Sequence, residues 1–161
     1  MKKTITYVFI DAQNLHLGIK DSGWKLDYLK FNIYLKEKYK AEKIFMYIGY
    51  IQSYENLYKY LRERDFHIVF KKVLNRNYRS DIKGNVDVCL TVDSIRKSNR
   101  YSQAIFISAD GDFLPLYDYL YKEKKKDLII LIPNIKKYSK LLIKYRSKLR
   151  FMNDLRDKIG E

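Results

Sequence analysis

The sequence predicts a single α/β domain, a three-layer sandwich with helices on both faces of a mostly parallel sheet of about five strands. Two observations predict this fold class. Short apolar runs rich in β-branched and aromatic residues alternate with helical patterns from end to end, which implies βαβ crossovers and parallel strands. No linker, repeat or low-complexity stretch divides the 161 residues, which suffice for one domain with a substantial core.

Five apolar runs are predicted as strands, because each is short and enriched in valine, isoleucine and aromatic residues. A short sixth strand is expected close to the C-terminal end of the sequence. The predicted strands are Ile5 to Ile10, Lys43 to Ile48, His67 to Val73, Ala104 to Ser108, Leu128 to Ile132 and, as the sixth, Leu149 to Met152.

Helical patterns fill the intervals between these runs. The predicted helices are Asn14 to Lys20, Tyr28 to Tyr39, Tyr54 to Arg64, Val86 to Lys97, Phe113 to Lys124 and Tyr138 to Lys144. One long irregular segment, Leu74 to Gly84, is polar and basic. It is interpreted either as a segment along which a substrate approaches or as an ordinary solvated connection.

The net charge favours a polyanionic partner. Lysine and arginine number 33 against 19 aspartates and glutamates, a formal charge of +14, which attracts nucleic acid. The codon bias of an AT-rich genome would also produce a lysine-rich chain. The stretch from residue 122 to residue 150 contains eleven basic residues and only two acidic ones. We expect Lys136, Lys137 and Lys140 in this stretch to bind RNA.

Three tyrosines, Tyr121, Tyr138 and Tyr145, are interleaved with these cations. Aromatic rings beside cations suit stacking on single-stranded bases, although tyrosines at this spacing are also typical of half-buried helix residues.

The sequence excludes several classes of protein. Cys89 is the only cysteine, so neither an intramolecular disulfide nor a cysteine-based zinc site can form. The apolar run before Asp11 is shorter than the ~7 to 15 residues of the apolar core of a signal peptide, and no run approaches the ~18 apolar residues of a membrane span. A cytoplasmic location is therefore expected. No glycine-rich phosphate loop or serine–histidine nucleophile motif is present.

Carboxylates follow two of the predicted strands. Asp11 comes directly after the first strand, and Asp110 and Asp112 come directly after the strand that ends at Ser108. The carboxyl ends of parallel strands form the ligand-binding edge of an α/β sheet. A third carboxylate, Asp87, stands at the predicted start of an apolar helix. Hard carboxylate oxygens select Mg²⁺ or Mn²⁺, so Asp11, Asp87 and Asp110 are the expected metal ligands.

Neighbouring polar residues have competing interpretations. Asp112 either assists catalysis or caps the helix whose first turn holds Pro115, and Asn14 either caps the first helix or hydrogen-bonds a phosphate. Asp93 lies roughly 120° around the helix from Asp87, so it is not expected to bind the same metal. It is expected either to support the metal ligands from a second shell or to be structural, through a hydrogen bond to a neighbouring loop or an ion pair with Arg96. His16 lies in the first helix and is interpreted as packed, solvated or lining the pocket.

These motifs, taken in order, resemble the NYN domains of the PIN-like nuclease superfamily, specifically the LabA-like bacterial proteins. Asp11 and Asn14 match the end of the first strand, and Ser108 to Phe113 match a Ser-x-Asp-x-Asp-Phe signature. Lys83, Gly84, Asp87 and Asp93 resemble a Lys-Gly-x-Asp helix opening, with one extra residue before Asp87. The resemblance covers nearly the whole chain.

The resemblance implies a single NYN domain over residues 1–161 with a Rossmann-like sheet, a bound Mg²⁺ or Mn²⁺, and ribonuclease activity. Asp11, Asp87, Asp110 and Asp112 are then the catalytic residues. Asn14, Lys83, Asp93 and Ser108 are expected to bind substrate or to support these acids from a second shell. The expected substrate is single-stranded RNA, bound by a basic monomer or by a homodimer that pairs two basic faces.

Two alternatives stay open at this point. The first is a non-catalytic RNA-binding or regulatory protein with a vestigial site, since a fold persists where turnover does not. The second is a toprim-like or phosphatase-like metalloenzyme. Toprim domains have a glutamate at the first motif, and dehalogenase-type phosphatases place Asp-x-Asp after the first strand. This chain has Asp11, Ala12 and Gln13 at that position, so both families fit it less well than the NYN domains do.

Overall fold

The computed structural model describes residues 2–71 and 79–161, and leaves aside the side chains of residues 79–85 within that range. Its centre is a six-stranded sheet in which each strand pairs in parallel with its neighbours, in the order β3-β2-β1-β4-β5-β6. The strands are β1 (Thr6–Asp11), β2 (Ala41–Gly49), β3 (His67–Lys71), β4 (Gln103–Ile107), β5 (Asp127–Ile132) and β6 (Leu149–Phe151). The parallel α/β sheet is confirmed, with six strands rather than about five.

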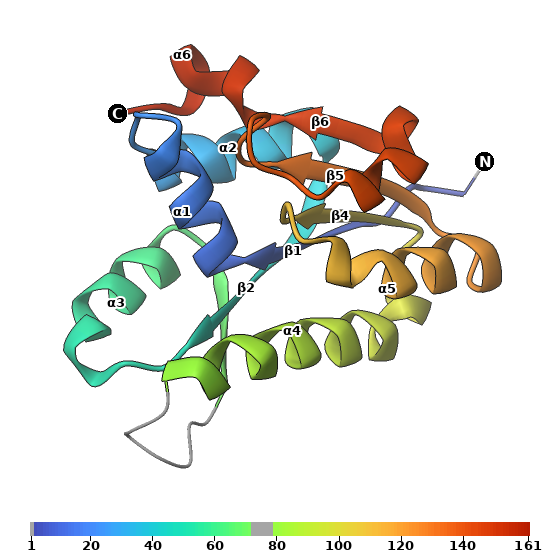
Figure 1. Ribbon diagram of the computed structural model, residues 1–161, viewed down its shortest axis with the longest axis horizontal. Helices are drawn as coiled ribbons and strands as arrows, with labels where there is room; N and C mark the ends of the chain where they lie inside the picture. Colours follow the sequence, from blue (N-terminus) through green and yellow to red (C-terminus); the bar gives the residue numbers. More distant parts are fainter. Residues whose placement is uncertain (1, 72–78) are drawn as a thin grey trace.

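Helices cover both faces of the sheet, as expected for parallel strands (Figure 1). Helices α1 (Ala12–Asp21), α2 (Tyr28–Tyr39), α3 (Glu55–Glu63) and α6 (Arg156–Ile159) contribute to one hydrophobic core. Helices α4 (Arg79–Arg96) and α5 (Leu114–Asp118), with the 3₁₀ segment Lys140–Lys148, contribute to the core on the other face. Short 3₁₀ turns lie at Gln52–Tyr54, Ser98–Arg100, Gly111–Phe113 and Met152–Leu155.

The side chains of β1 alternate between these two cores. Val8 and Ile10 pack with α1 and α2, whereas Tyr7 and Phe9 pack with α4 and α5. Because successive side chains of a strand point to opposite faces, Asp11 continues the row of Tyr7 and Phe9. The last residue of β1 therefore carries its carboxylate to the side of the sheet that α4 and α5 cover.

Helix α4 begins earlier than the sequence suggested. It starts at Arg79 rather than at Val86, so Gly84 and Asp87 lie inside a helix and Asp87 is not at its start. Residues 74–78 of the expected irregular segment lie outside the described residues. Gly84 weakens a helix by roughly 1 kcal/mol, but packing of Val86 and Leu90 on the sheet outweighs such a local preference.

The segments after β4 and β5 are helical as expected, with altered geometry. Helix α5 has a proline in its first turn and continues as a π-helical turn at Tyr119–Glu123. The segment expected as a helix at Tyr138 to Lys144 is the 3₁₀ segment Lys140–Lys148, which is kinked at Tyr145. Within the described residues, no helix is both long and apolar enough to traverse a bilayer.

Asp118 joins α5 to the 3₁₀ segment Lys140–Lys148. It accepts hydrogen bonds from Lys144 Nζ at 2.8 Å and from the Tyr145 hydroxyl at 2.5 Å. The hydrogen bond from Lys144, and then that from Tyr145, hold the pKa of Asp118 below its usual value of 3.8. Because the folded-state pKa is lowered, the stabilisation is complete above the unfolded pKa and is lost as pH falls through the folded value.

We therefore expect Asp118→Asn to lower the free energy of unfolding by roughly 0.5–1 kcal/mol at pH 7, a small effect because the pair is partly exposed. The difference from wild type should shrink as the pH falls below about 4. Urea denaturation at a series of pH values from 7 to 2.5 measures it. A difference that stays constant over this series would contradict the assignment.

Candidate functional site

The candidate site lies where β1 and β4 run side by side. The two strands pair in register, with Ile10 opposite Ile107, so Asp11 and Ser108 are adjacent at the carboxyl edge. After β1 the chain enters α1 on one face of the sheet, and after β4 it enters α5 on the other face. In an open α/β sheet, ligands usually bind at the strand ends where the chain diverges in this way, a position called here the β1–β4 switch point.

Asp11, the last residue of β1, is buried at this edge of the sheet, with 5% of its surface exposed. It is the N-cap of α1, and its Oδ1 accepts a hydrogen bond from the Asn14 backbone amide at 3.2 Å. Its Oδ2 accepts a longer hydrogen bond, 3.4 Å, from the Ser108 hydroxyl. The capping role expected for Asn14 is wrong, because Asp11 fills that position.

Asn14 and Ser108 connect Asp11 to the loop that carries Asp110. The Asn14 side-chain oxygen accepts a hydrogen bond from the Ala109 amide at 2.8 Å. The Ser108 hydroxyl accepts one from the Asp110 amide at 3.1 Å. Both residues therefore fix the position of Asp110 relative to Asp11, so that the two carboxylates belong to one hydrogen-bonded unit.

Asp110, not Asp112, caps the helical turn that follows. Its Oδ1 accepts a hydrogen bond from the Asp112 amide at 2.9 Å and it precedes the 3₁₀ turn Gly111–Phe113. The expected capping role of Asp112 is therefore wrong, and the Asp112 side chain is exposed to solvent. Asp112 is available to contact a ligand from outside.

Asp87 comes to the site from α4. Asp87 and Asp112 line one cavity of about 210 Å³, together with Val88, Thr91, Val92 and Phe113. The structure thus places Asp11 with Asp110 and Asp87 with Asp112. Among the described residues, no three Asp, Glu, His or Cys side chains lie close enough to form a complete metal-binding group.

Asp93 has a different set of contacts. Its carboxylate accepts hydrogen bonds from the buried Tyr47 hydroxyl and from Lys97 Nζ, directly after the end of α4. Lys97, rather than the expected Arg96, is its ionic partner. Asp93 therefore fixes α4 to β2. The side chain of Lys83 lies outside the described residues.

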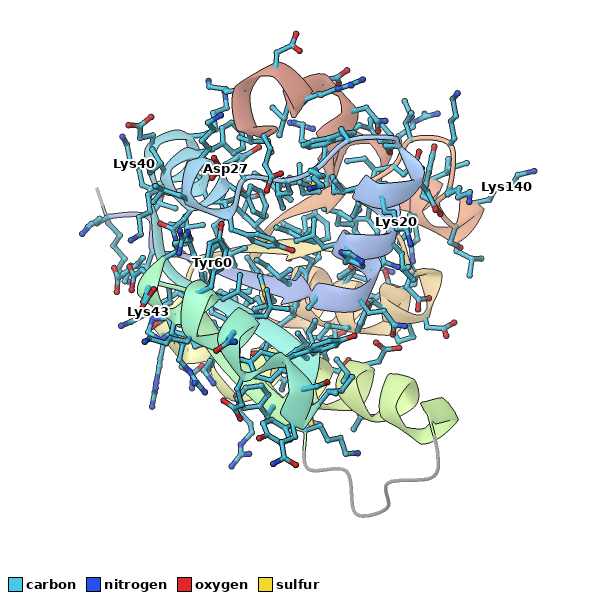
Figure 2. The ribbon with its side chains drawn as sticks, turned by 90° about the vertical axis from the view of Figure 1, so that its left-hand side faces the viewer. Lys20, Asp27, Lys40, Lys43, Tyr60 and Lys140 are labelled. Atoms are coloured by element: carbon cyan, nitrogen blue, oxygen red, sulfur yellow. The ribbon has the colours of Figure 1, made fainter. Side chains whose placement is uncertain are left out.

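A basic loop follows β5 at the same edge of the sheet. Lys136, Lys137 and Lys140 are exposed, and Lys137 is paired with Asp21 at 2.8 Å. This loop is in direct contact with the loop after β4 that carries Asp110 and Asp112, called here the acidic loop. The Ser139 amide donates a hydrogen bond to the Ala109 carbonyl at 3.0 Å. A Cβ atom at Gly111 would lie 2.3 Å from Ser139 Oγ, so only glycine permits this approach. Figure 2 shows Lys140 on the opposite side of the molecule from Lys40 and Lys43.

The interleaved tyrosines are mostly structural. Tyr145 is buried and its hydroxyl is bound to Asp118, while Tyr138 packs against Phe151 with ring centroids 5.5 Å apart. Tyr121 is 43% exposed, but it lies after α5 in the sequence and therefore not next to the loop that carries Asp110. Packing accounts for Tyr138 and Tyr145 better than base stacking does, although only Tyr145 lies in a helical segment and Tyr138 lies in the loop before it.

One residue at the site, Tyr117, was not singled out by the sequence analysis. It is fully buried on α5, and among the described residues its hydroxyl has no hydrogen-bond partner. Burial, and then the negative charges of Asp11 and Asp110, raise the pKa of Tyr117 above its usual value. The hydroxyl therefore stays protonated close to two carboxylates. In the sequence it reads as one more apolar position of a helix.

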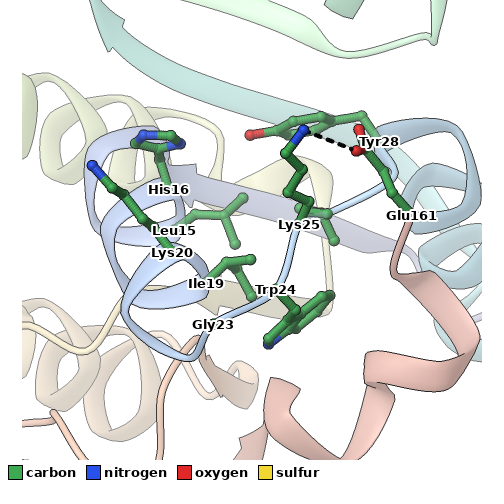
Figure 3. A pocket seen from close by; sticks show the side chains of 10 residues that line it. Leu15, His16, Ile19, Lys20, Gly23, Trp24, Lys25, Tyr28 and Glu161 are labelled. Carbon is green, nitrogen blue, oxygen red and sulfur yellow. Dashed lines mark ion pairs between the residues drawn. The ribbon is translucent and has the colours of Figure 1, made fainter.

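A separate hollow of about 490 Å³ lies beside α1 and includes His16, Lys20 and Trp24 (Figure 3). Lys25 and Glu161 form an ion pair at its rim. The lining residues Leu15 and Ile19 belong to the core opposite to that of α4 and α5, so this hollow is not part of the acidic site. His16 is exposed here and does not line the cavity of Asp87 and Asp112.

The fold and the strand-edge acids define a parallel α/β domain with carboxylates at the β1–β4 switch point. Residues 5–153 match the NYN domain model, so the chain belongs to the NYN domain family, part of the PIN-like nuclease superfamily. The chain also superposes on a crystal structure of a protein of unknown function from Vibrio parahaemolyticus, with a TM-score of 0.83, 20% identity and full coverage of both chains. This likeness concerns the fold. No curated protein matches the chain.

Proposed function

We propose that this NYN domain is a metal-dependent ribonuclease that hydrolyses phosphodiester bonds at the β1–β4 switch point. The observation that carries the proposal is the hydrogen-bonded unit of Asp11, Ser108 and Asp110 at the ligand-binding edge of the sheet. The basic loop that touches this unit supplies the charge needed to hold an RNA backbone. Membership of a nuclease superfamily supports the same activity.

The residues present fit a bound Mg²⁺ or Mn²⁺. Both Asp11 and Asp110 direct one carboxylate oxygen, Oδ1, to a backbone amide. The second oxygen of Asp11, which accepts the hydrogen bond from Ser108, and the second oxygen of Asp110 are hard donors of the kind these ions prefer. Mg²⁺ keeps several waters and uses only one or two carboxylates with the substrate phosphate, so two such residues suffice to hold it. Asp87 would add a third carboxylate from α4.

When bound, the metal ion would activate water and neutralise charge on the phosphate. Asp11 and Asp110 would bind the ion, and the capping hydrogen bonds would keep their carboxylates in a fixed orientation. The exposed Asp112 would face the attacking water and accept a proton from it. Asn14 and Ser108 would preserve the spacing of the two strand ends, and Asp93 would hold α4 and thus Asp87 in place.

Single-stranded RNA is the proposed substrate, and Lys136, Lys137 and Lys140 would contact its phosphates. Lys136 and Lys140 form no ion pair within the described part of the chain, whereas Lys137 is shared with Asp21. The cytoplasmic location and the homodimer stay predictions.

Changing Lys136, Lys137 and Lys140 together to glutamine is expected to weaken RNA binding about tenfold at 50 mM salt and to reduce the salt dependence of the dissociation constant. The control replaces Lys38, Lys43 and Lys124, which are exposed near the opposite edge of the sheet, so the total charge is equal. Fluorescence anisotropy of labelled single-stranded RNA measures both variants. Equal affinities for the two variants would contradict a role for the basic loop.

The proposed activity is tested by a cleavage time course on labelled single-stranded RNA with Mn²⁺, Mg²⁺ or EDTA. Cleavage that requires the metal and is abolished by EDTA supports the proposal. Cleavage in EDTA would rule out metal dependence. Tight, salt-dependent RNA binding with no cleavage in either metal would favour a non-catalytic RNA-binding protein instead. Rapid hydrolysis of a small phosphate monoester would favour a phosphatase-like enzyme.

A further inference from the structure

Tyr117 lies between α5 and the sheet, directly behind the candidate site. Its ring contacts Phe106 of β4 at a centroid distance of 5.0 Å and Phe113 at 6.3 Å. Phe106 is two residues before Ser108 on the same face of β4, and this is also the face to which Asp11 belongs. Side chains on a helix lean toward its N-terminus, which here is the turn that Asp110 caps.

The hydroxyl of Tyr117 differs from those of the other deeply buried tyrosines. Tyr47 donates its hydrogen bond to Asp93, and Tyr101 donates to the Ser94 carbonyl at 2.8 Å. Within the described residues the Tyr117 hydroxyl has no such partner, although the residue has no exposed surface. A phenylalanine would fill the same space without burying an unsatisfied polar atom.

The surroundings indicate what this hydroxyl binds. It lies close enough to Asp11 and Asp110 for both charges to raise its pKa. It is therefore a neutral donor in the neighbourhood of two acceptors, and it is directly hydrogen-bonded to neither of them within the described residues. A buried water typically makes about three hydrogen bonds to otherwise unsatisfied polar groups. One donor and two carboxylates are the set that a single water requires.

We propose that Tyr117 is a positioning residue that holds a buried water between Asp11 and Asp110. The Tyr117 hydroxyl donates a hydrogen bond to the water oxygen, and the two water hydrogens are donated to the two carboxylates. The water fixes the orientation of both carboxylates for the metal ion, so this inference rests on the proposed function. Interactions of this outer kind typically change metal affinity 10–100-fold.

The test compares Tyr117→Phe with Tyr101→Phe, a control that removes a satisfied hydroxyl from the same core. Titration calorimetry with Mn²⁺ alone measures the dissociation constant of each protein, and thermal unfolding measures stability. Tyr117→Phe should raise the Mn²⁺ dissociation constant about tenfold. Tyr101→Phe should lower the melting temperature, because the Ser94 carbonyl loses its donor, and leave the Mn²⁺ affinity unchanged.

An unchanged Mn²⁺ affinity of Tyr117→Phe, with a raised melting temperature, would overturn the proposal, because the hydroxyl would then be merely unsatisfied. A crystal structure of the metal-free wild type tests directly whether the buried water is present, and this test does not depend on metal binding. A water within hydrogen-bond distance of the Tyr117 hydroxyl and both carboxylates supports the proposal, and a dry hydroxyl contradicts it. If the wild type binds no Mn²⁺, metal-dependent catalysis fails, while this crystallographic result still decides the role of Tyr117.

Discussion

Replacing Asp110 with asparagine is expected to reduce metal-dependent RNA cleavage at least about 10³-fold while the fold is retained. A factor of this size corresponds to roughly 4 kcal/mol of lost transition-state stabilisation, the order expected when a metal ligand is removed. Asparagine keeps the side-chain oxygen that accepts the hydrogen bond from the Asp112 amide, so the turn after β4 is preserved. The variant loses only the charge and one anionic oxygen.

The measurement is a single-turnover cleavage rate at saturating Mn²⁺, with the two proteins purified identically so that a contaminating nuclease is detected. Asp118→Asn is the matched control, because it removes the same charge from the following helix and its partners are Lys144 and Tyr145. The control should keep full activity. Unchanged cleavage by the Asp110 variant would exclude Asp110 from the metal site.

The sheet could be predicted from the sequence because each strand is short, apolar and buried, and because α/β alternation has few alternatives. The carboxyl-edge position of Asp11 and Asp110 follows from the same pattern, since both directly follow strands. Strand order does not follow, and it is the order β2-β1-β4-β5 that makes Asp11 and Ser108 neighbours. The register of Ile10 with Ile107 then sets their contact.

Other features of the site depend on contacts that a linear pattern does not contain. Helix α4 extends back to Arg79 although Gly84 suggests a helix boundary, because tertiary packing outweighs local preference. Asn14 resembles a capping residue by spacing alone, but Asp11 takes the cap and frees Asn14 to bind Ala109. Tyr117 has no distinguishing signal in the sequence, since only the folded chain places its hydroxyl near two acids.

The hydrogen bonds of Asp11 and Asp110 distinguish the structural role of each residue from the role of its charge. Asp11 and Asp110 each use Oδ1 to terminate a local turn, and these bonds persist in an amide. The charge on each residue is not needed for those bonds, so these bonds alone do not account for a carboxylate rather than an amide at either position.

Asp11 allows these two roles to be measured independently, by comparing Asp11→Asn with Asp11→Ala. Asparagine and aspartate are equally good N-caps, whereas alanine loses the cap of α1 at a cost of roughly 1 kcal/mol, or about 2–4 °C in melting temperature for a chain of this size. Both variants should lose cleavage by at least about 10³-fold, because both lose the charge that binds the metal. Only the alanine variant should be less stable.

Asp27 provides the matched control for this pair. It caps α2 with the same geometry, accepting a hydrogen bond from the Lys30 amide at 3.0 Å, and it is remote from the acidic loop in sequence and in contacts. Asp27→Ala should lower the melting temperature by a similar amount and leave cleavage intact. Since capping is common to both positions, activity lost at Asp11 and kept at Asp27 must come from the carboxylate at the β1–β4 switch point. Full cleavage by Asp11→Asn would instead reduce Asp11 to a helix cap and leave the metal to Asp110 and Asp87.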